Sequence, residues 1–212
     1  MKKINILCTL LFFAMVSFTA CDKDDKKNDP KDNSSVIGDT GLETLIINGK
    51  IGDYVSDIDP DKVTKISVCR NYSDASSGRN AITEVTVTNK QFSLTLTTPP
   101  TDALISVESK FGGDGLSISN PSAKCFIACF SAFGMNQNTP IYKMNDVFKT
   151  EEEYEEEYWY VDSDVSITGT VDTEVYNLKL KKGWNVIGSQ SSGSTETWKN
   201  AKMRSDLLWV NP

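Results

Sequence analysis

Thr83–Thr97 reads TEVTVTNKQFSLTLT, and this stretch decides the fold class. Before the Asn89–Lys90 pair the apolar residues are Val85 and Val87, and after it every second residue of Phe92–Leu96 is apolar. Alternation with period two is typical of a β-strand that buries one face. A polar two-residue connection suits a tight hairpin turn. The stretch therefore predicts two antiparallel strands joined at Asn89–Lys90.

The same alternation returns later in the chain. Asn177–Lys181 reads NLKLK, and Lys182–Gly183 turns the chain into Trp184–Ile187. Further strands are expected at 44–52, 63–72, 103–110, 124–133, 155–162, 165–171 and 206–210. No segment after residue 20 has the 3.6-residue period of an amphipathic helix. About ten short strands joined by polar turns indicate an all-β fold, and we expect an antiparallel β-sandwich.

Residues 1–20 have the features of a secretory signal peptide. Two lysines precede an apolar run that ends in small residues. The run is at the lower limit for a helix that crosses about 30 Å of hydrocarbon. Residues 22–35 contain only Asp, Lys, Asn, Pro and Ser, which cannot build a core. We expect a signal peptide at 1–20, a disordered polar tether at 21–38 and one β-sandwich domain at 39–212, with a candidate lobe boundary near 112–123.

Phe18–Cys21 reads FTAC, which resembles the lipobox of bacterial lipoproteins. The resemblance implies cleavage before Cys21 and acylation of that cysteine, for example with palmitate, so that the acyl chains anchor the protein in a membrane. Asp22, Asp24 and Asp25 resemble the acidic export signal of surface lipoproteins in Bacteroidetes-type bacteria. That resemblance implies the outer membrane, with the protein facing the cell exterior. In enterobacterial lipoproteins an Asp after the cysteine implies inner-membrane retention instead, and we expect the outer membrane.

Two shorter resemblances concern the domain itself. The Asn48–Ile51 stretch, together with the Phe92–Leu94 run that ends at Pro99–Pro100, looks loosely like the transthyretin-like modules. Leu180–Asn185 looks like segments of uncharacterised Bacteroidetes-type lipoproteins. Both resemblances imply a small β-sandwich, and neither implies a particular activity.

Composition excludes several classes of function. The formal net charge is −7, and loss of Lys2 and Lys3 with the signal would make it more negative, which disfavours nucleic acid as a partner. The chain contains no histidine, which excludes Ser-His-Asp and Cys-His catalysis and the usual catalytic zinc sites. A phosphate-binding Gly-Lys-Ser/Thr loop is also missing. Glycoside hydrolysis by a pair of carboxylates stays open, but we expect a protein that is not an enzyme.

Cys69, Cys125 and Cys129 are the cysteines that remain if Cys8 leaves with the signal and Cys21 is acylated. Cys125 and Cys129 stand four residues apart in a segment that is apolar on both faces, or roughly 13 Å along a strand. Disulfides need Cα atoms within about 7 Å. At most one disulfide can therefore form, from Cys69 to one of the other two. The alternative is three buried thiols that act as small hydrophobic side chains.

The most unusual stretch of the domain places six glutamates around Tyr154 and leads into Tyr158–Val161. On a strand Tyr158 and Tyr160 face one way and Trp159 faces the other. If Trp159 is inside, the two tyrosines form an exposed pair whose flat rings can stack on sugars. Trp198 has polar neighbours and is expected to be exposed as well. The candidate ligand-binding residues are Tyr158, Trp159, Tyr160 and Trp198. The alternative is a charged edge strand whose aromatic side chains fill the core.

The same acidic stretch offers oxygen ligands for a hard cation. Glu155, Glu157, Asp162 and Asp164 are the candidate Ca²⁺ ligands, because calcium binds six to eight oxygens. No other cofactor is expected.

The sequence as a whole predicts a non-catalytic binding protein, anchored to the outer membrane through Cys21. Polysaccharide is the expected ligand, and an envelope protein is the other expected class of partner. The alternative is a structural or assembly subunit of a cell-envelope complex, which binds another protein through an apolar patch or an open sheet edge.

Overall fold

Strands dominate the computed structural model, which describes residues 41–55, 60–77, 80–136, 139–145 and 154–211. All described residues belong to one compact unit, residues 36–212. The expected signal peptide at 1–20, the acylation site Cys21 and the tether at 21–38 lie outside the described residues.

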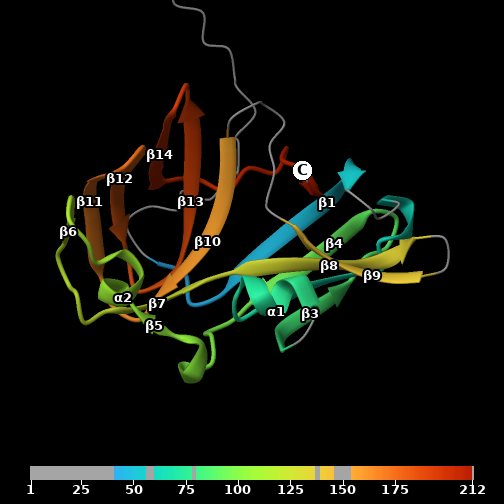
Figure 1. Cartoon of the computed structure of the whole chain (residues 1–212). Coiled ribbons are helices and arrows are strands. Elements are labelled where there is room, and N and C mark those ends of the chain that lie inside the picture. Colours follow the sequence, from blue (N-terminus) through green and yellow to red (C-terminus); the bar gives the residue numbers. More distant parts are fainter. Residues whose placement is uncertain (1–40, 56–59, 78–79, 137–138, 146–153, 212) are drawn as a thin grey trace, which may run out of the picture. The chain divides into compact units, whose positions relative to one another are not determined.

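Fifteen strands in the described part of the chain form three sheets (Figure 1). The three-stranded sheet has the order β15-β1-β4, with β1 (Leu45–Val55), β4 (Gln91–Leu96) and β15 (Trp209–Asn211). The four-stranded sheet has the order β3-β2-β8-β9, with β2 (Lys65–Cys69), β3 (Ala81–Thr86), β8 (Cys129–Asn136) and β9 (Thr139–Asn145).

The eight-stranded sheet has the order β5-β7-β10-β13-β14-β12-β11-β6. Its strands are β5 (Ile105–Ser106), β6 (Leu116–Ile118), β7 (Lys124–Ile127), β10 (Tyr154–Val161), β11 (Val165–Val171), β12 (Glu174–Leu180), β13 (Gly183–Ser192) and β14 (Thr195–Asn200). The expected all-β fold is confirmed. The pairs β1–β15 and β12–β14 are parallel, so the three-stranded and eight-stranded sheets are mixed. The four-stranded sheet is antiparallel throughout.

Thr83–Thr97 turns at Asn89–Lys90 as expected, and its two strands then join different sheets. Asn89 and Lys90 have φ angles of 51° and 60°, and Thr88 and Gln91 exchange two backbone hydrogen bonds of 2.9 Å across them. Two consecutive positive φ angles suit a type I′ turn. Beyond this bridge β3 pairs with β2, whereas β4 pairs with β1 in another sheet. The predicted turn is confirmed, but the two strands form a corner between sheets and not a long hairpin.

Alternating side chains build two hydrophobic clusters. The first draws on all three sheets and includes Phe92, Phe130, Trp184 and Trp209. The second lies on one face of the eight-stranded sheet, where α2 (Val107–Phe111) packs against it (Figure 1). Both clusters reach β10, so this strand is buried on both of its faces.

The apolar segment 124–133 is two strands, and not the single central strand that was expected. β7 belongs to the eight-stranded sheet and β8 to the four-stranded sheet, and the chain changes sheet at Ala128. Ala128 donates its backbone N–H to Tyr158 O at 3.0 Å, which holds this crossing point against β10. β7 is buried because Cys125 enters the second cluster and Phe126 the first, and β8 is buried because Phe130 and Ala132 enter the first.

The expected strand at 103–110 is wrong over most of its length. Only β5 is extended, and α2 follows directly, because the Ser106 hydroxyl caps the helix by accepting from Ser109 N at 3.2 Å. The candidate lobe boundary at 112–123 contains β6, which joins the same sheet as β5 and β7. The other helical segments are α1 (Tyr72–Ser77) and the 3₁₀ turns η1 (Pro60–Lys62) and η2 (Thr101–Ala103). Among the described residues, none of the helices has the length and apolar character needed to cross a membrane.

Candidate functional site

A cavity of about 790 Å³ lies over one face of the eight-stranded sheet. Strand alternation places Glu157 and Trp159 of β10, Glu174 and Tyr176 of β12, and Trp198 of β14 on this face. The neighbouring strands β5 and β7 of the same sheet add Ile105, Phe126 and Ile127. The remaining lining residues come from outside this sheet: Arg70 and Asn71 after β2, Asp102 and Ala103 of η2, Lys110 and Phe111 of α2, and Cys129 of β8.

Four of the lining side chains form one aromatic cluster: Phe111, Trp159, Tyr176 and Trp198. Tyr176 and Trp198 are register partners on the parallel strands β12 and β14, and their rings stack at 6.2 Å between centroids with 7° between planes. Trp159 lies 6.2 Å from Trp198, and Phe111 stacks on Trp159 at 5.0 Å. Trp159 is only 2% exposed, whereas Phe111, Tyr176 and Trp198 are half-buried. Part of the cluster's ring surface therefore faces the cavity.

Two glutamate carboxylates accept hydrogen bonds from the polar atoms of these rings. Trp159 Nε1 donates to Glu157 Oε2 at 2.6 Å, and the Tyr176 hydroxyl donates to Glu174 Oε2. In each case the partners are two residues apart on one strand, so they share a face. Burial and the bond to Glu174 raise the pKa of Tyr176 well above its usual range, so the phenol stays neutral and remains a donor. Both carboxylates belong to the lining of the cavity and bring acceptor oxygens to it.

The opposite wall carries positive charge. Arg70 Nη1 donates to Asp102 Oδ2 at 2.6 Å, and this bond holds the pKa of the Asp102 carboxyl below its usual range. Lys110 of α2 also lines the cavity. The cavity therefore combines flat apolar surfaces with both donors and acceptors, as binding sites for small polar molecules do.

The structure separates the four candidate binding residues. Trp159 and Trp198 line the cavity together. Tyr158 and Tyr160 lie on the other face of β10 and are 2% and 7% exposed, so the expectation of an exposed tyrosine pair is wrong. Tyr158 packs against Phe130 and Trp209 in the first hydrophobic cluster, which covers this face of the strand.

Tyr176, Glu174 and Phe111 were not found by the sequence reasoning. The signal for the first two was present: Glu174 and Tyr176 have the same i, i+2 spacing as Glu157 and Trp159. That spacing does not show which strands lie side by side in the sheet, so it could not indicate that the two pairs line the same cavity.

The candidate calcium ligands do not come together. Glu155 lies near the start of β10 and Asp162 just beyond its end, a separation of roughly 23 Å along a strand. Asp162 Oδ1 accepts from Lys124 N at 2.9 Å. The described residues contain no group of three or more carboxylate, cysteine or histidine side chains placed to hold a metal ion. The expected calcium site is therefore not formed by these residues.

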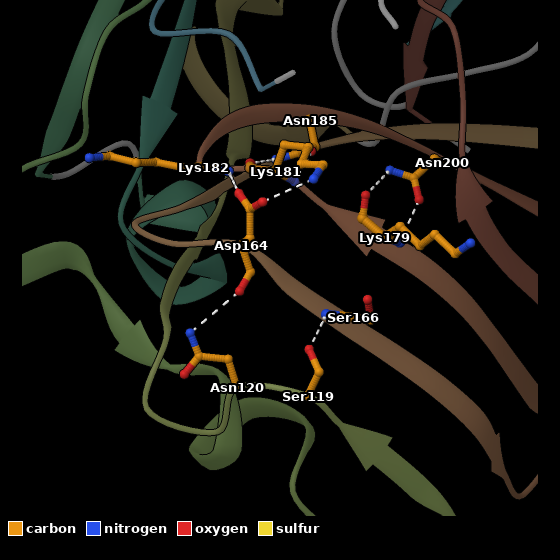
Figure 2. A network of polar contacts seen from close by, with 9 residues as sticks. All are labelled: Ser119, Asn120, Asp164, Ser166, Lys179, Lys181, Lys182, Asn185 and Asn200. Carbon is orange, nitrogen blue, oxygen red and sulfur yellow. Dashed lines mark hydrogen bonds and ion pairs between the residues drawn. The ribbon is translucent and has the colours of Figure 1, made fainter. Parts of the chain in front are cut away.

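Asp164 has a structural position instead. Its carboxylate accepts from Lys182 N at 2.9 Å and from Lys181 Nζ at 3.0 Å, and its backbone oxygen accepts from Asn120 Nδ2 at 3.4 Å (Figure 2). The backbone N–H of Lys182 and the ammonium of Lys181 hold the pKa of Asp164 below its usual range. Nearby, the buried Asn185 side chain accepts from Lys181 N at 2.9 Å through Oδ1 and donates to Lys181 O at 2.8 Å through Nδ2. This network joins the turn after β10 to the turn after β12.

Another ionisable group of the glutamate run is buried outside the cavity. Glu156 is 1% exposed, and its Oε1 accepts from Arg204 N at 3.0 Å and from the Tyr154 hydroxyl at 3.3 Å. Its Oε2 has no hydrogen-bond partner. Burial raises the pKa of Glu156 to about 7. Glu156 lies on the opposite face of β10 from Glu157, so it does not line the cavity. Its hydrogen bond from Arg204 N instead links the segment after β14 to β10.

Comparison of the chain with protein-family models, with curated protein sequences and with solved structures finds no match. The fold and the site define an all-β protein with an aromatic and carboxylate-lined cavity over one sheet face.

Proposed function

We propose that this protein binds a saccharide in the cavity over the eight-stranded sheet, without chemical conversion of the ligand. The observation that carries the proposal is the convergence of the half-buried rings of Tyr176 and Trp198 with the carboxylates of Glu157 and Glu174 in one cavity of about 790 Å³. A sugar ring presents C–H groups on its faces and hydroxyls around its edge. Aromatic faces complement the former, and carboxylates complement the latter.

The arrangement of charges also suits a polyhydroxylated ligand. Sugar hydroxyls donate and accept hydrogen bonds equally well, and the cavity offers acceptors on the sheet and the donors Arg70 and Lys110 on the facing wall. The overall negative charge disfavours polyanions, so neutral or amino sugars are the preferred class.

The test is binding of the purified chain to an array of neutral, amino and acidic polysaccharides, followed by calorimetry with the best oligosaccharide. Trp198→Ala should weaken binding by about tenfold or more, because a half-buried ring at a binding surface is the type of residue that dominates affinity. Tyr176→Phe should weaken it less, by loss of the hydroxyl that orders Glu174.

Tyr160→Phe is the matched control, since it removes a hydroxyl from an aromatic residue on the opposite face of the same sheet. It should leave affinity unchanged. Circular dichroism and thermal melts of each variant separate loss of the site from loss of the fold. Binding that Trp198→Ala leaves intact, or the absence of binding to every saccharide, would contradict the proposal.

The proposed setting is the outer membrane, with Cys21 acylated and the domain facing the cell exterior. The support is the lipobox-like FTAC sequence and the acidic run that follows it. Incorporation of labelled palmitate into the chain, lost in Cys21→Ala, tests the anchor. Protease treatment of intact cells tests the exposure, since a domain inside the outer membrane would be protected.

Glu157 and Glu174 keep one enzymatic alternative testable, because a carboxylate pair is the requirement for glycoside hydrolysis. The array experiment therefore includes a chromatographic assay for cleaved product, and cleavage would show that the site hydrolyses the saccharide instead of only binding it.

The assembly alternative has less support, since the exposed large apolar side chains of the described residues are Ile46 and Ile105, which belong to different sheets.

A further inference from the structure

Two of the three cysteines of the domain are direct neighbours across a pair of strands. Cys69, the last residue of β2, is the register partner of Cys129, the first residue of β8. They pack together with Ala75 of α1 in a small cluster of their own, at 0% and 6% exposure. Cys125 belongs to a different sheet and packs in the cluster beneath α2.

The register brings the two backbones within bonding range. Residues directly opposite on antiparallel strands have Cα atoms about 4.5–5.5 Å apart and side chains on the same face. Disulfides form between Cα atoms about 4.4–6.8 Å apart. No disulfide is present in the described part of the chain, and the same register would accept one with little backbone movement.

We propose that Cys69 and Cys129 form a cross-strand disulfide when the protein meets a small or protein-borne disulfide oxidant. A thiolate attacks one sulfur of the oxidant and expels a thiol, and the second cysteine then attacks the mixed disulfide and expels the other thiol. One S–S bond is broken and one is formed. The two protons and two electrons of the cysteines leave with the two thiols.

The cavity provides the route of entry. Cys129 is among the residues that line it, so this is the cysteine that we expect a small disulfide to reach first. Cys129 lines the cavity and is 6% exposed, whereas Cys69 is fully buried and does not line it, so the first attack falls to Cys129. Cys69 completes the bond from across the strand.

The bond would act on stability and on the cavity wall. It would close a loop of about 60 residues, which restricts the unfolded chain and should raise Tm by roughly 10 °C. Arg70 follows Cys69 directly, so the bond would also fix the start of the wall that carries Arg70 and Asp102.

The test treats the full chain with oxidised glutathione, blocks remaining thiols and maps peptides by mass spectrometry without reduction. Trypsin leaves Cys125 and Cys129 on one peptide, so chymotrypsin, which cleaves after Phe126, is used to separate them. We expect a Cys69–Cys129 link and a Tm rise of roughly 10 °C that dithiothreitol reverses.

Cys125→Ser is the matched control and should keep both the link and the Tm rise, whereas Cys129→Ser should lose both. The peptide map of the unmodified chain decides the question even if a variant fails to fold. A link from Cys69 to Cys125, or glutathione adducts with no link to Cys69, would overturn the proposal.

Discussion

Glu156 gives the sharpest prediction, because a buried carboxyl with an unsatisfied oxygen should make the stability of the fold depend on pH. The perturbation is Glu156→Gln, which keeps the shape and the acceptor oxygen for Arg204 N and Tyr154 but removes the ionisation. The ionisable groups that surround the site are Tyr154, Tyr158 and Asp206, together with the Arg204 guanidinium.

The magnitude follows from the pKa of Glu156, which burial raises from 4.5 to about 7. Below pH 4.5 the carboxyl is protonated in both folded and unfolded chains, and it carries no penalty. Between pH 4.5 and 7 only the unfolded chain releases the proton, so the free energy of unfolding falls by about 1.4 kcal/mol per pH unit. Above pH 7 the full cost, up to about 3 kcal/mol, is present.

The assay is urea unfolding followed by tryptophan fluorescence at intervals from pH 4 to pH 8. Glu156→Gln should match the parent chain near pH 4 and exceed its stability by about 2–3 kcal/mol at pH 8. Glu43→Gln is the control, since Glu43 is exposed. Other groups titrate equally in parent and variant, so the difference isolates Glu156. Two parallel pH profiles would refute the reasoning.

Three further changes test the backbone and the core. Asn185→Ala should lower the free energy of unfolding by about 3 kcal/mol, because its buried amide bonds three backbone groups at 2.8–2.9 Å; a loss below about 1 kcal/mol in urea would contradict this. Gly49→Ala should cost about 1–3 kcal/mol in thermal unfolding, because a Cβ there would lie 2.1 Å from the Phe92 ring, and Phe92→Leu should recover part of the loss. Asn89→Ala should cost about 1 kcal/mol at a φ of 51°, whereas Asn89→Gly should cost nothing.

Local patterns in the sequence predicted much of the fold. Phe92, Leu94 and Leu96 are buried and the residues between them are exposed, as the alternation indicated. The Ser106 cap could have been read as the start of α2, but a five-residue helix is too short to show a periodic stripe.

Local patterns could not predict which strands pair when they are distant in the sequence. Alternation showed that Tyr158 and Trp159 face opposite ways. It could not show that each face of β10 is covered by a hydrophobic cluster of its own. The cavity has the same origin, because Trp159 and Trp198 approach only through the register of β10, β13, β14 and β12. Long-range registers are decided by the packing of whole sheets, and a single sequence carries little direct signal for them.

The parallel pairing of β1 with β15 has a consequence for how the chain matures. Ile51 lies opposite Trp209, so the three-stranded sheet cannot be completed until residue 209 has left the ribosome. Until then Trp209 cannot pack against its three aromatic neighbours, Phe92, Phe130 and Tyr158. Contacts between such distant residues make folding slow, because the long loop must close before any stabilising contact forms. The three-stranded sheet should therefore form late in folding, after residue 209 has emerged.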